Sequence, residues 1–303
     1  MKLPFVLTLS LALLSPLVSA QEIKLLASDG VPDDSFGVSC ALSDTTAVVG
    51  AYEGDGNFAD SGAAYLFDTA TGAELAKLTA SDGEFNDYFG QSVAISGDKV
   101  LVGASLDDDN GFSSGSAYLF DATTGAQLAK LTASDGAGGD WFGWSVDISG
   151  TTAIIGAPHD NNTFTNCGSA YLFDITTGAE IGKLSASDRA PEDKFGISVA
   201  ISGNIAIIGA FGDDDNGNSS GSAYLFDITT GAEIAKLLSS DGAAGDNFGR
   251  VVAISGTTAL VGVYDDDDNG PESGSAYLFD TTTGLEIAKL LASDGESVDR
   301  FGF

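Results

Sequence analysis

The chain has 303 residues, 43% of them hydrophobic, and it carries 44 acidic against 12 basic side chains. The resulting net charge of −32 excludes nucleic acids and anionic lipid surfaces as partners, because both are bound through a basic footprint. It favours cations, basic partners or a saline environment.

The first predicted element is a secretory signal peptide over residues 1–20. Lys2 supplies the positive start, residues 3–14 are mostly apolar, and small residues precede an expected cleavage after Ala20. The apolar run is too short for a membrane span, and no later stretch comes near the required length. We therefore expect the mature chain, residues 21–303, to be secreted, or to be held in the periplasm or at the cell surface.

Beyond the signal peptide, a Phe-Gly pair recurs at a constant interval of 53 residues. Such an interval indicates one supersecondary unit copied five times, with the start of a sixth. Because a short repeat cannot bury its own apolar faces, we expect the units to stack into one continuous domain over residues 21–303. The phenylalanines of the pairs are Phe36, Phe89, Phe142, Phe195, Phe248 and Phe301.

Each unit contains four short runs of strand character separated by turn-forming residues. In the unit that begins at Phe89 these runs are FGQSVAIS, KVLVGAS, GSAYLFD and AQLAKLTAS. No segment shows a sustained 3.6-residue apolar period, so the sequence predicts an all-β chain. The first run alternates small and larger residues, which suits a crowded inner position. Four-stranded units repeated around an axis are typical of a β-propeller.

The fourth run of every unit carries a lysine at the same repeat position. A regularly placed lysine on the outermost strand is interpreted as a device against edge-to-edge pairing. The six lysines are Lys24, Lys77, Lys130, Lys183, Lys236 and Lys289.

The motifs FGxSVAIS, VGA and GSAYLFD resemble the FG-GAP repeat of integrin α-subunit propellers and their bacterial relatives. The resemblance covers roughly residues 22–303 and implies a β-propeller with a general role in extracellular binding. It identifies no partner. The family often places a calcium loop of the DxNxDG kind between the first and second strands. Here that link is too short, so those metal ligands are not carried over.

The number of blades is left open by the sequence. Residues 22–28 would supply an orphan fourth strand, and five complete units follow before the sixth stops. The resemblance implies a seven-bladed ring, which needs about two more units. Either five blades close the ring, or the chain is a piece of a longer propeller, which the end within a repeat favours. Neighbouring chains could also complete an open arc by self-association through the open ends.

Acidic residues gather in the loops after the second and fourth strands, which should emerge on one face because consecutive strands are antiparallel. The DDDNG-like loops after the second strand predict calcium sites, since calcium prefers six to eight oxygen ligands. The alternative is that these residues form turns and a solvated acidic surface. The candidate ligands are Asp107, Asp108, Asp109, Asn110, Asp213, Asp214, Asp215, Asn216, Asp265, Asp266, Asp267, Asp268 and Asn269.

A second set of aspartates precedes each Phe-Gly pair by seven and by two residues, as Asp82 and Asp87 do. We expect the nearer aspartate of each pair to cap its own loop rather than to bind a metal.

Positions where the units differ are the best candidates for contacts with a ligand. The residue two positions after each Phe varies most, and Asp147 stands where other units have alanine. Drift at a tolerant position is the alternative explanation. The candidate contacts are Gln91, Trp144, Asp147, Ile197 and Arg250.

Catalytic motifs are sparse. His159 is the only histidine, it falls in a loop, and the sequence has no nucleophilic triad and no CxxC or HExxH motif. We therefore expect a non-catalytic recognition or adhesion module that binds an extracellular protein or glycan. The alternatives are a propeller glycoside hydrolase or lyase that uses Asp147, and a structural repeat protein of an envelope or matrix. Cys40 and Cys167 are expected to remain unbridged, because they fall in non-neighbouring units.

Overall fold

The structure is a computed structural model that describes residues 22–303. The predicted signal peptide, residues 1–20, lies outside the described residues. The described chain consists of strands and turns, with no helix, so it also has no helix that could cross a membrane. Cys40 and Cys167 are both free thiols, which confirms that they are not bridged.

Within residues 22–303, twenty strands form five separate four-stranded antiparallel sheets, one for each repeat. Blade 1 contains β1 (Cys40–Ser43), β2 (Thr46–Ala51), β3 (Ala63–Asp68) and β4 (Glu74–Leu78). Blade 2 contains β5 (Phe89–Ser96), β6 (Lys99–Ala104), β7 (Ser116–Asp121) and β8 (Gln127–Leu131). Blade 3 contains β9 (Ser145–Ser149), β10 (Thr152–Ala157), β11 (Ser169–Asp174) and β12 (Ala179–Leu184). Blade 4 contains β13 (Val199–Ser202), β14 (Ile205–Ala210), β15 (Ser222–Asp227) and β16 (Ala232–Leu237). Blade 5 contains β17 (Val251–Ser255), β18 (Thr258–Val263), β19 (Ser275–Asp280) and β20 (Glu286–Leu290).

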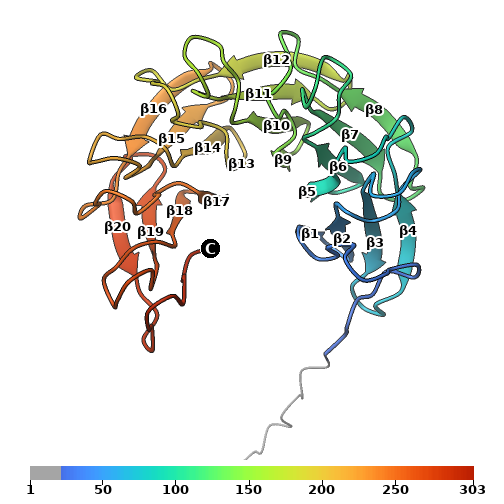
Figure 1. The fold of residues 1–303 in the computed structure, drawn as a ribbon, viewed down its shortest axis with the longest axis horizontal. Coiled ribbons are helices and arrows are strands. Elements are labelled where there is room, and N and C mark those ends of the chain that lie inside the picture. Colours follow the sequence, from blue (N-terminus) through green and yellow to red (C-terminus); the bar gives the residue numbers. More distant parts are fainter. Residues whose placement is uncertain (1–21) are drawn as a thin grey trace, which may run out of the picture.

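The blades follow one another around an open arc, with the first strand of each sheet on the inside and the fourth on the outside (Figure 1). The all-β class, the four strands per repeat and the propeller-like arrangement are thereby confirmed. Figure 1 also shows that the five blades do not close into a ring, since β1 and β17 lie on opposite sides of the opening.

The hydrophobic core lies in the seams between neighbouring blades. The cluster between blades 1 and 2 takes Val48 and Leu66 from one blade and Val100 and Tyr118 from the next. Phe89 of the Phe-Gly pair packs edge-on against Tyr118, with ring centroids 5.5 Å apart, and is fully buried. Burial of one such side chain contributes about 1.5–3 kcal/mol, so each repeat is stabilised mainly by its neighbours.

The glycine of the Phe-Gly pair is required by the close approach of two blades. Gly143 has φ +90°, and a Cβ built on it would lie 2.2 Å from the carbonyl oxygen of Ser116. Next to it, Phe142 forms an isolated parallel bridge with Gly115. A side chain at residue 143 would therefore push this turn away from the strand it bridges.

Residues 22–28 do not form the orphan fourth strand that the repeat predicts, because no strand is present there. The segment nevertheless lies where the fourth strand of a preceding blade would lie. Ser28 donates to the carboxylate of Glu74 through its amide (2.8 Å) and its hydroxyl (3.0 Å), and Ser134 and Glu180 make the same link between blades 2 and 3. Residues 22–28 therefore lie at the place of a fourth strand, but they have no third strand beside them with which to pair.

Blades 1 and 5 lie at the two ends of the arc, and they expose side chains whose equivalents in other blades are buried. Leu290 is 37% exposed, whereas the equivalent Leu237 is 1% exposed, and Leu42 is 72% exposed against 8% for Ile95. Self-association through these ends stays a prediction.

Candidate functional site

The loops after the second and fourth strands meet on one face of the arc, as predicted. Lys130 on β8 joins them: its Nζ donates to Asp82 in the loop after β4 (2.8 Å) and to Asp107 in the loop after β6 (2.9 Å). It also pairs with Asp109. The ammonium group therefore lies at the centre of the acidic cluster of its blade.

A tyrosine side chain also belongs to this cluster. The hydroxyl of Tyr118 lies 2.7 Å from Asp107 and 3.0 Å from Asp82, and Lys130 lies over its ring, 5.1 Å from the centroid. Ser116 donates to the second oxygen of Asp107 at 3.0 Å. Asp107 is buried, and its carboxylate is held by a cation, a phenol and a hydroxyl.

The same network recurs in the other blades. Lysine, two aspartates and tyrosine meet in blades 3, 4 and 5, and blade 1 has a reduced version with one aspartate. The groups are Lys183, Asp135, Asp160 and Tyr171; Lys236, Asp188, Asp213 and Tyr224; Lys289, Asp241, Asp266 and Tyr277; and Lys77, Asp29 and Tyr65. These lysines are ion-paired within their blades, a role that the interpretation as edge protection did not foresee.

The network shifts the titration of its members. Burial by itself would raise the pKa of Asp82, but hydrogen bonds from Lys130 and Tyr118 outweigh it and hold that pKa below the usual value. Burial likewise acts to lower the pKa of Lys130, and the carboxylates of Asp109, Asp82 and Asp107 raise it instead. These shifts of the Asp82 and Lys130 pKa values both favour the charged forms of this ion pair at neutral pH.

The predicted metal ligands fall into three groups by what they contact. The first group is buried and held by lysine and tyrosine, and the second pairs with lysine near the surface. The third is exposed and bonds mainly within its own loop. These groups are Asp107, Asp213 and Asp266; Asp109, Asp215 and Asp268; and Asp108, Asn110, Asp214, Asn216, Asp267 and Asn269. Asp265 stands apart, because it accepts a hydrogen bond from Asn247 at 2.7 Å.

One cluster places three carboxylates at metal-binding separation. Oxygen atoms of Asp188, Asp213 and Asp215 lie within 4.8 Å of one another. The Nζ of Lys236, however, is 2.7–2.8 Å from all three carboxylates. The donor set therefore fits calcium poorly, because an ammonium group already lies where the ion would have to bind.

The aspartates two residues before each Phe cap their own loops, as predicted. Asp87 accepts the amide of Glu84 at 2.6 Å, and Asp140 accepts that of Ala137 at 2.7 Å. Burial, reinforced by the nearby Asp107 charge, raises the pKa of Asp87 to about 6 in spite of that amide. Burial has the same effect on Asp193.

Four predicted ligand contacts lie one per blade beside the inner strands, on the loop face. Gln91 is bonded to Ser105, and Ile197 is half-buried at the start of the strand region of blade 4. Trp144 stacks on Trp141, with centroids 5.2 Å apart and planes 17° apart. Each of these residues lies within or just before the first strand of a different blade.

Arg250, the fourth, lies between two aromatic rings of different blades. Its guanidinium is 4.9 Å from the ring of Phe211 in blade 4 and 5.4 Å from that of Tyr264 in blade 5. Lys194 adds a second cation over Phe211, at 5.2 Å. Such contacts contribute about 0.5–1 kcal/mol each at exposed sites.

Several residues next to these four positions were not predicted as ligand contacts. Tyr88, Trp141, Lys194 and Arg300 precede the Phe of their Phe-Gly pairs, a repeat position as variable as the one that was chosen. Tyr52, Phe211 and Tyr264 directly follow their VGA-type motifs, a position for which no ligand contact was predicted. We call the following set of side chains the inner rim: Tyr52, Tyr88, Gln91, Trp141, Trp144, His159, Lys194, Ile197, Phe211, Arg250, Tyr264 and Arg300.

Asp147 and His159 are both tied into the fold. The Asp147 carboxylate accepts the amide of Ile201 from the next blade and its neighbour Ile148, both at 2.8 Å. Burial raises the pKa of Asp147. The His159 ring lies 3.9 Å from that of Trp141, and its Nδ1 is 3.2 Å from Asn166. Burial, together with the charge of Lys194, lowers its pKa.

Comparison with family models agrees with the geometry. The FG-GAP repeat model matches five consecutive segments, residues 20–67, 73–120, 126–173, 179–226 and 232–279. The chain belongs to the FG-GAP repeat family. The last four matched segments each join the fourth strand of one blade to the first three strands of the next. The first segment has residues 22–28 at the place of that fourth strand, followed by β1, β2 and β3. A search of curated proteins finds no match to the chain.

Proposed function

We propose that this protein is a secreted, non-catalytic recognition module that contacts an extracellular protein or glycan through the inner rim. The observation that carries the proposal is a contrast between two layers of the same face. The network of lysine, aspartate and tyrosine is nearly identical in blades 2–5, whereas the inner rim changes from Trp141 and Trp144 to Phe211 and Arg250. The constant layer supports the loops, and the variable layer supplies specificity.

The chemistry of the inner rim suits recognition. Aromatic rings and a few cations lie half-buried beside a strongly acidic surface. Aromatic residues and arginine are enriched where proteins bind partners, because they offer large contact areas at low entropic cost. The basic, apolar and small-residue pattern of residues 1–20 supports export of the module.

The surroundings of Asp147 favour this proposal over hydrolysis. A glycosidase needs two carboxyl groups on either side of a bond, in unlike environments. Here both carboxylate oxygens of Asp147 accept backbone amides and hold β9 to the neighbouring blade. We therefore propose that Asp147 positions a seam and takes no part in catalysis.

Calcium is proposed only in a limited role. The exposed carboxylates of Asp108, Asp214 and Asp267 are not paired with a lysine, and on this proposal they are the ones that bind calcium. Extracellular modules commonly bind calcium with a dissociation constant of about 10⁻⁴–10⁻³ M. On this proposal calcium stiffens the outer loops without creating the binding surface.

The test uses residues 21–303 on an array of immobilised extracellular polysaccharides and matrix proteins. We expect saturable binding to at least one probe, with a loss of tenfold or more in a Trp144→Ala/Arg250→Ala variant. Phe164→Ala is the matched control, since Phe164 is exposed on an outer loop tip of the same face. Binding that survives the inner-rim substitutions, or no saturable binding to any probe, would contradict the proposal.

A further inference from the structure

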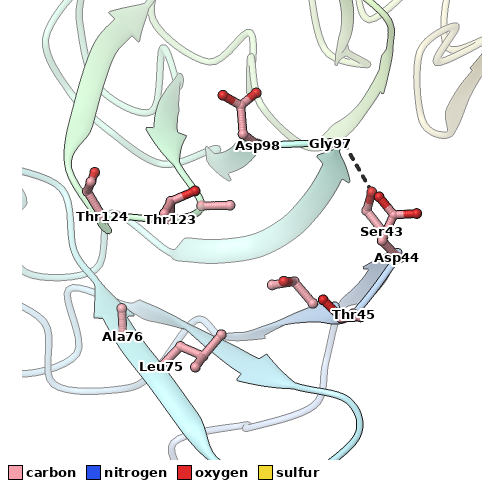
Figure 2. Close-up of a pocket in the computed structure, with 11 residues that line it drawn as sticks. Ser43, Asp44, Thr45, Leu75, Ala76, Gly97, Asp98, Thr123 and Thr124 are labelled. Atoms are coloured by element: carbon pink, nitrogen blue, oxygen red, sulfur yellow. Dashed lines mark hydrogen bonds between the residues drawn. The ribbon is translucent and has the colours of Figure 1, made fainter.

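A pocket of about 430 Å³ opens on the face opposite the acidic loops, between blades 1 and 2. Figure 2 shows its walls: Ser43, Asp44 and Thr45 come from the turn of blade 1, and Gly97 and Asp98 come from the matching turn of blade 2. The volume lies within the range of about 300–1,000 Å³ that is usual for small-ligand sites.

One repeat position on the wall of the pocket holds a smaller residue in blade 2 than in the next two blades. Ala122 lines it, whereas the same position in the next two blades holds Ile175 and Ile228. The side chain of Ile175 is 5% exposed and belongs to the hydrophobic core between blades 2 and 3. Ala122 leaves the corresponding volume empty between blades 1 and 2.

The wall of the pocket departs from the repeat a second time. Asp44 has φ +50° at the position where the other units have Gly97, Gly150, Gly203 and Gly256. Among residues 22–303, its carboxylate forms no ion pair. Asp98, the other acid of the pocket, is paired with Lys99 at 2.8 Å. Asp44 is exposed at the edge of the pocket, beside Ser43 (Figure 2), so the pocket has one carboxylate at its edge without an ion pair among residues 22–303.

The remaining wall combines hydroxyl groups with a small apolar floor. Thr45, Thr46 and Thr123 bring hydroxyls, and Ser43 accepts the amide of Gly97 at 3.0 Å, which ties the two turns together (Figure 2). Leu75 is 53% exposed and forms the apolar side with Ala76 and Ala122. Hydroxyls that both donate and accept suit a ligand that also carries hydroxyl groups.

We propose that this pocket binds a small organic cation that carries hydroxyl groups, of the size of a hexosamine. Its ammonium group pairs with the Asp44 carboxylate, its hydroxyls bond to the threonines, and its carbon skeleton lies over Leu75 and Ala122. The net charge of −32 attracts such a ligand and repels anions. The site is separate from the inner rim, so it can succeed or fail independently of the recognition function.

The test measures binding of glucosamine to residues 21–303 by saturation-transfer NMR and titration calorimetry, with glucose as the neutral probe of equal size. Glucosamine should bind, and glucose should bind at least tenfold more weakly. Ala122→Ile fills the pocket with the side chain that the neighbouring blades carry, and it should reduce the affinity for glucosamine tenfold or more.

Asp44→Gly removes the free carboxylate and restores the residue of the other units, so this variant should fold and should also lose tenfold in affinity. The matched control is Asp33→Gly, which removes an exposed aspartate of positive φ (+78°) elsewhere and should bind glucosamine as the parent does. The proposal is overturned if glucosamine fails to bind, if Asp44→Gly binds it unchanged, or if glucose binds equally well.

Discussion

The ammonium group of Lys130 pairs with three carboxylates that lie around it, those of Asp82, Asp107 and Asp109, and partly offsets their charge. Without it, the buried Asp107 carboxyl group would lie beside Asp82 with no cation to pair with, which is costly in a region of low dielectric. The acidic composition of the loops is therefore tolerated because each blade supplies its own cation.

Replacement of this cation is the first prediction. Lys130→Met keeps the stem and removes the charge, and it should lower the free energy of unfolding by about 2–3 kcal/mol in urea denaturation. The control Lys24→Met, at an exposed lysine outside the described ion pairs, should change it by less than about 0.5 kcal/mol. A Lys130→Met/Asp107→Asn variant should recover part of the loss. Equal losses at Lys24 and Lys130 would mean that the network adds nothing to stability.

The sequence contains a signal for this network in the spacing of its lysines and aspartates. Lys130 follows Asp107 by 23 residues and Asp82 by 48, and Lys236 stands at the same distances from Asp213 and Asp188. Taken alone, the lysine pattern predicts protection of the edge strand, and the aspartate pattern predicts metal ligands. Their pairing depends on how the loops fold over the strand ends, which spacing alone does not specify.

At the scale of elements, the four strands of a repeat were predicted to within a few residues. The runs from Phe89 to Ser96 and from Lys99 to Ser105 correspond to β5 and β6 almost residue for residue. Residues 22–28 were predicted as a strand on the same pattern, but a strand requires a hydrogen-bonded neighbour, and no third strand lies beside them. Local pattern predicts a strand's position, and pairing decides whether it forms.

The seam between blades gives the second prediction. Gly143→Ala should lower the free energy of unfolding by about 3 kcal/mol or more. The new Cβ would lie 2.2 Å from the carbonyl oxygen of Ser116, and the alanine would have to adopt the positive φ of Gly143. Gly97→Ala is the matched control, since it also has a positive φ (+57°) but open space around its Cβ, and it should cost about 1 kcal/mol. Urea unfolding followed by circular dichroism compares them. Equal losses of stability in the two variants would show that the neighbouring blades can move apart to accommodate the Cβ, which would contradict the prediction.

For the whole molecule, the third prediction concerns pH. The folded pKa of Asp87 and of Asp193 is about 6, above the unfolded value of about 3.9, so folding takes up protons and stability rises as pH falls from 7 toward 4. The lowered pKa values of Asp82, Asp135 and Asp188 act in the opposite sense, because their stabilisation is lost below about pH 4. The thermal midpoint at fixed ionic strength should therefore peak between about pH 4 and 6.

An Asp87→Asn/Asp193→Asn variant is the control for this profile. Asparagine keeps the amide contact of each loop without the titration, so the rise between pH 7 and pH 5 should become smaller. A parent midpoint that falls steadily from pH 7 to pH 5 would contradict the raised pKa values.

The last prediction separates metal binding from screening, because the net charge of −32 makes any salt stabilising. Millimolar calcium should raise the thermal midpoint only slightly above sodium chloride of equal ionic strength, since Lys236 already lies among the carboxylates of Asp188, Asp213 and Asp215. In Lys236→Met that cluster is freed, and the extra stabilisation by calcium should grow as the ion replaces the ammonium group. A parent protein that loses several degrees in EDTA would show that calcium is bound elsewhere and tightly. An unchanged calcium response in Lys236→Met would show that the cluster cannot hold the ion even when the lysine is gone.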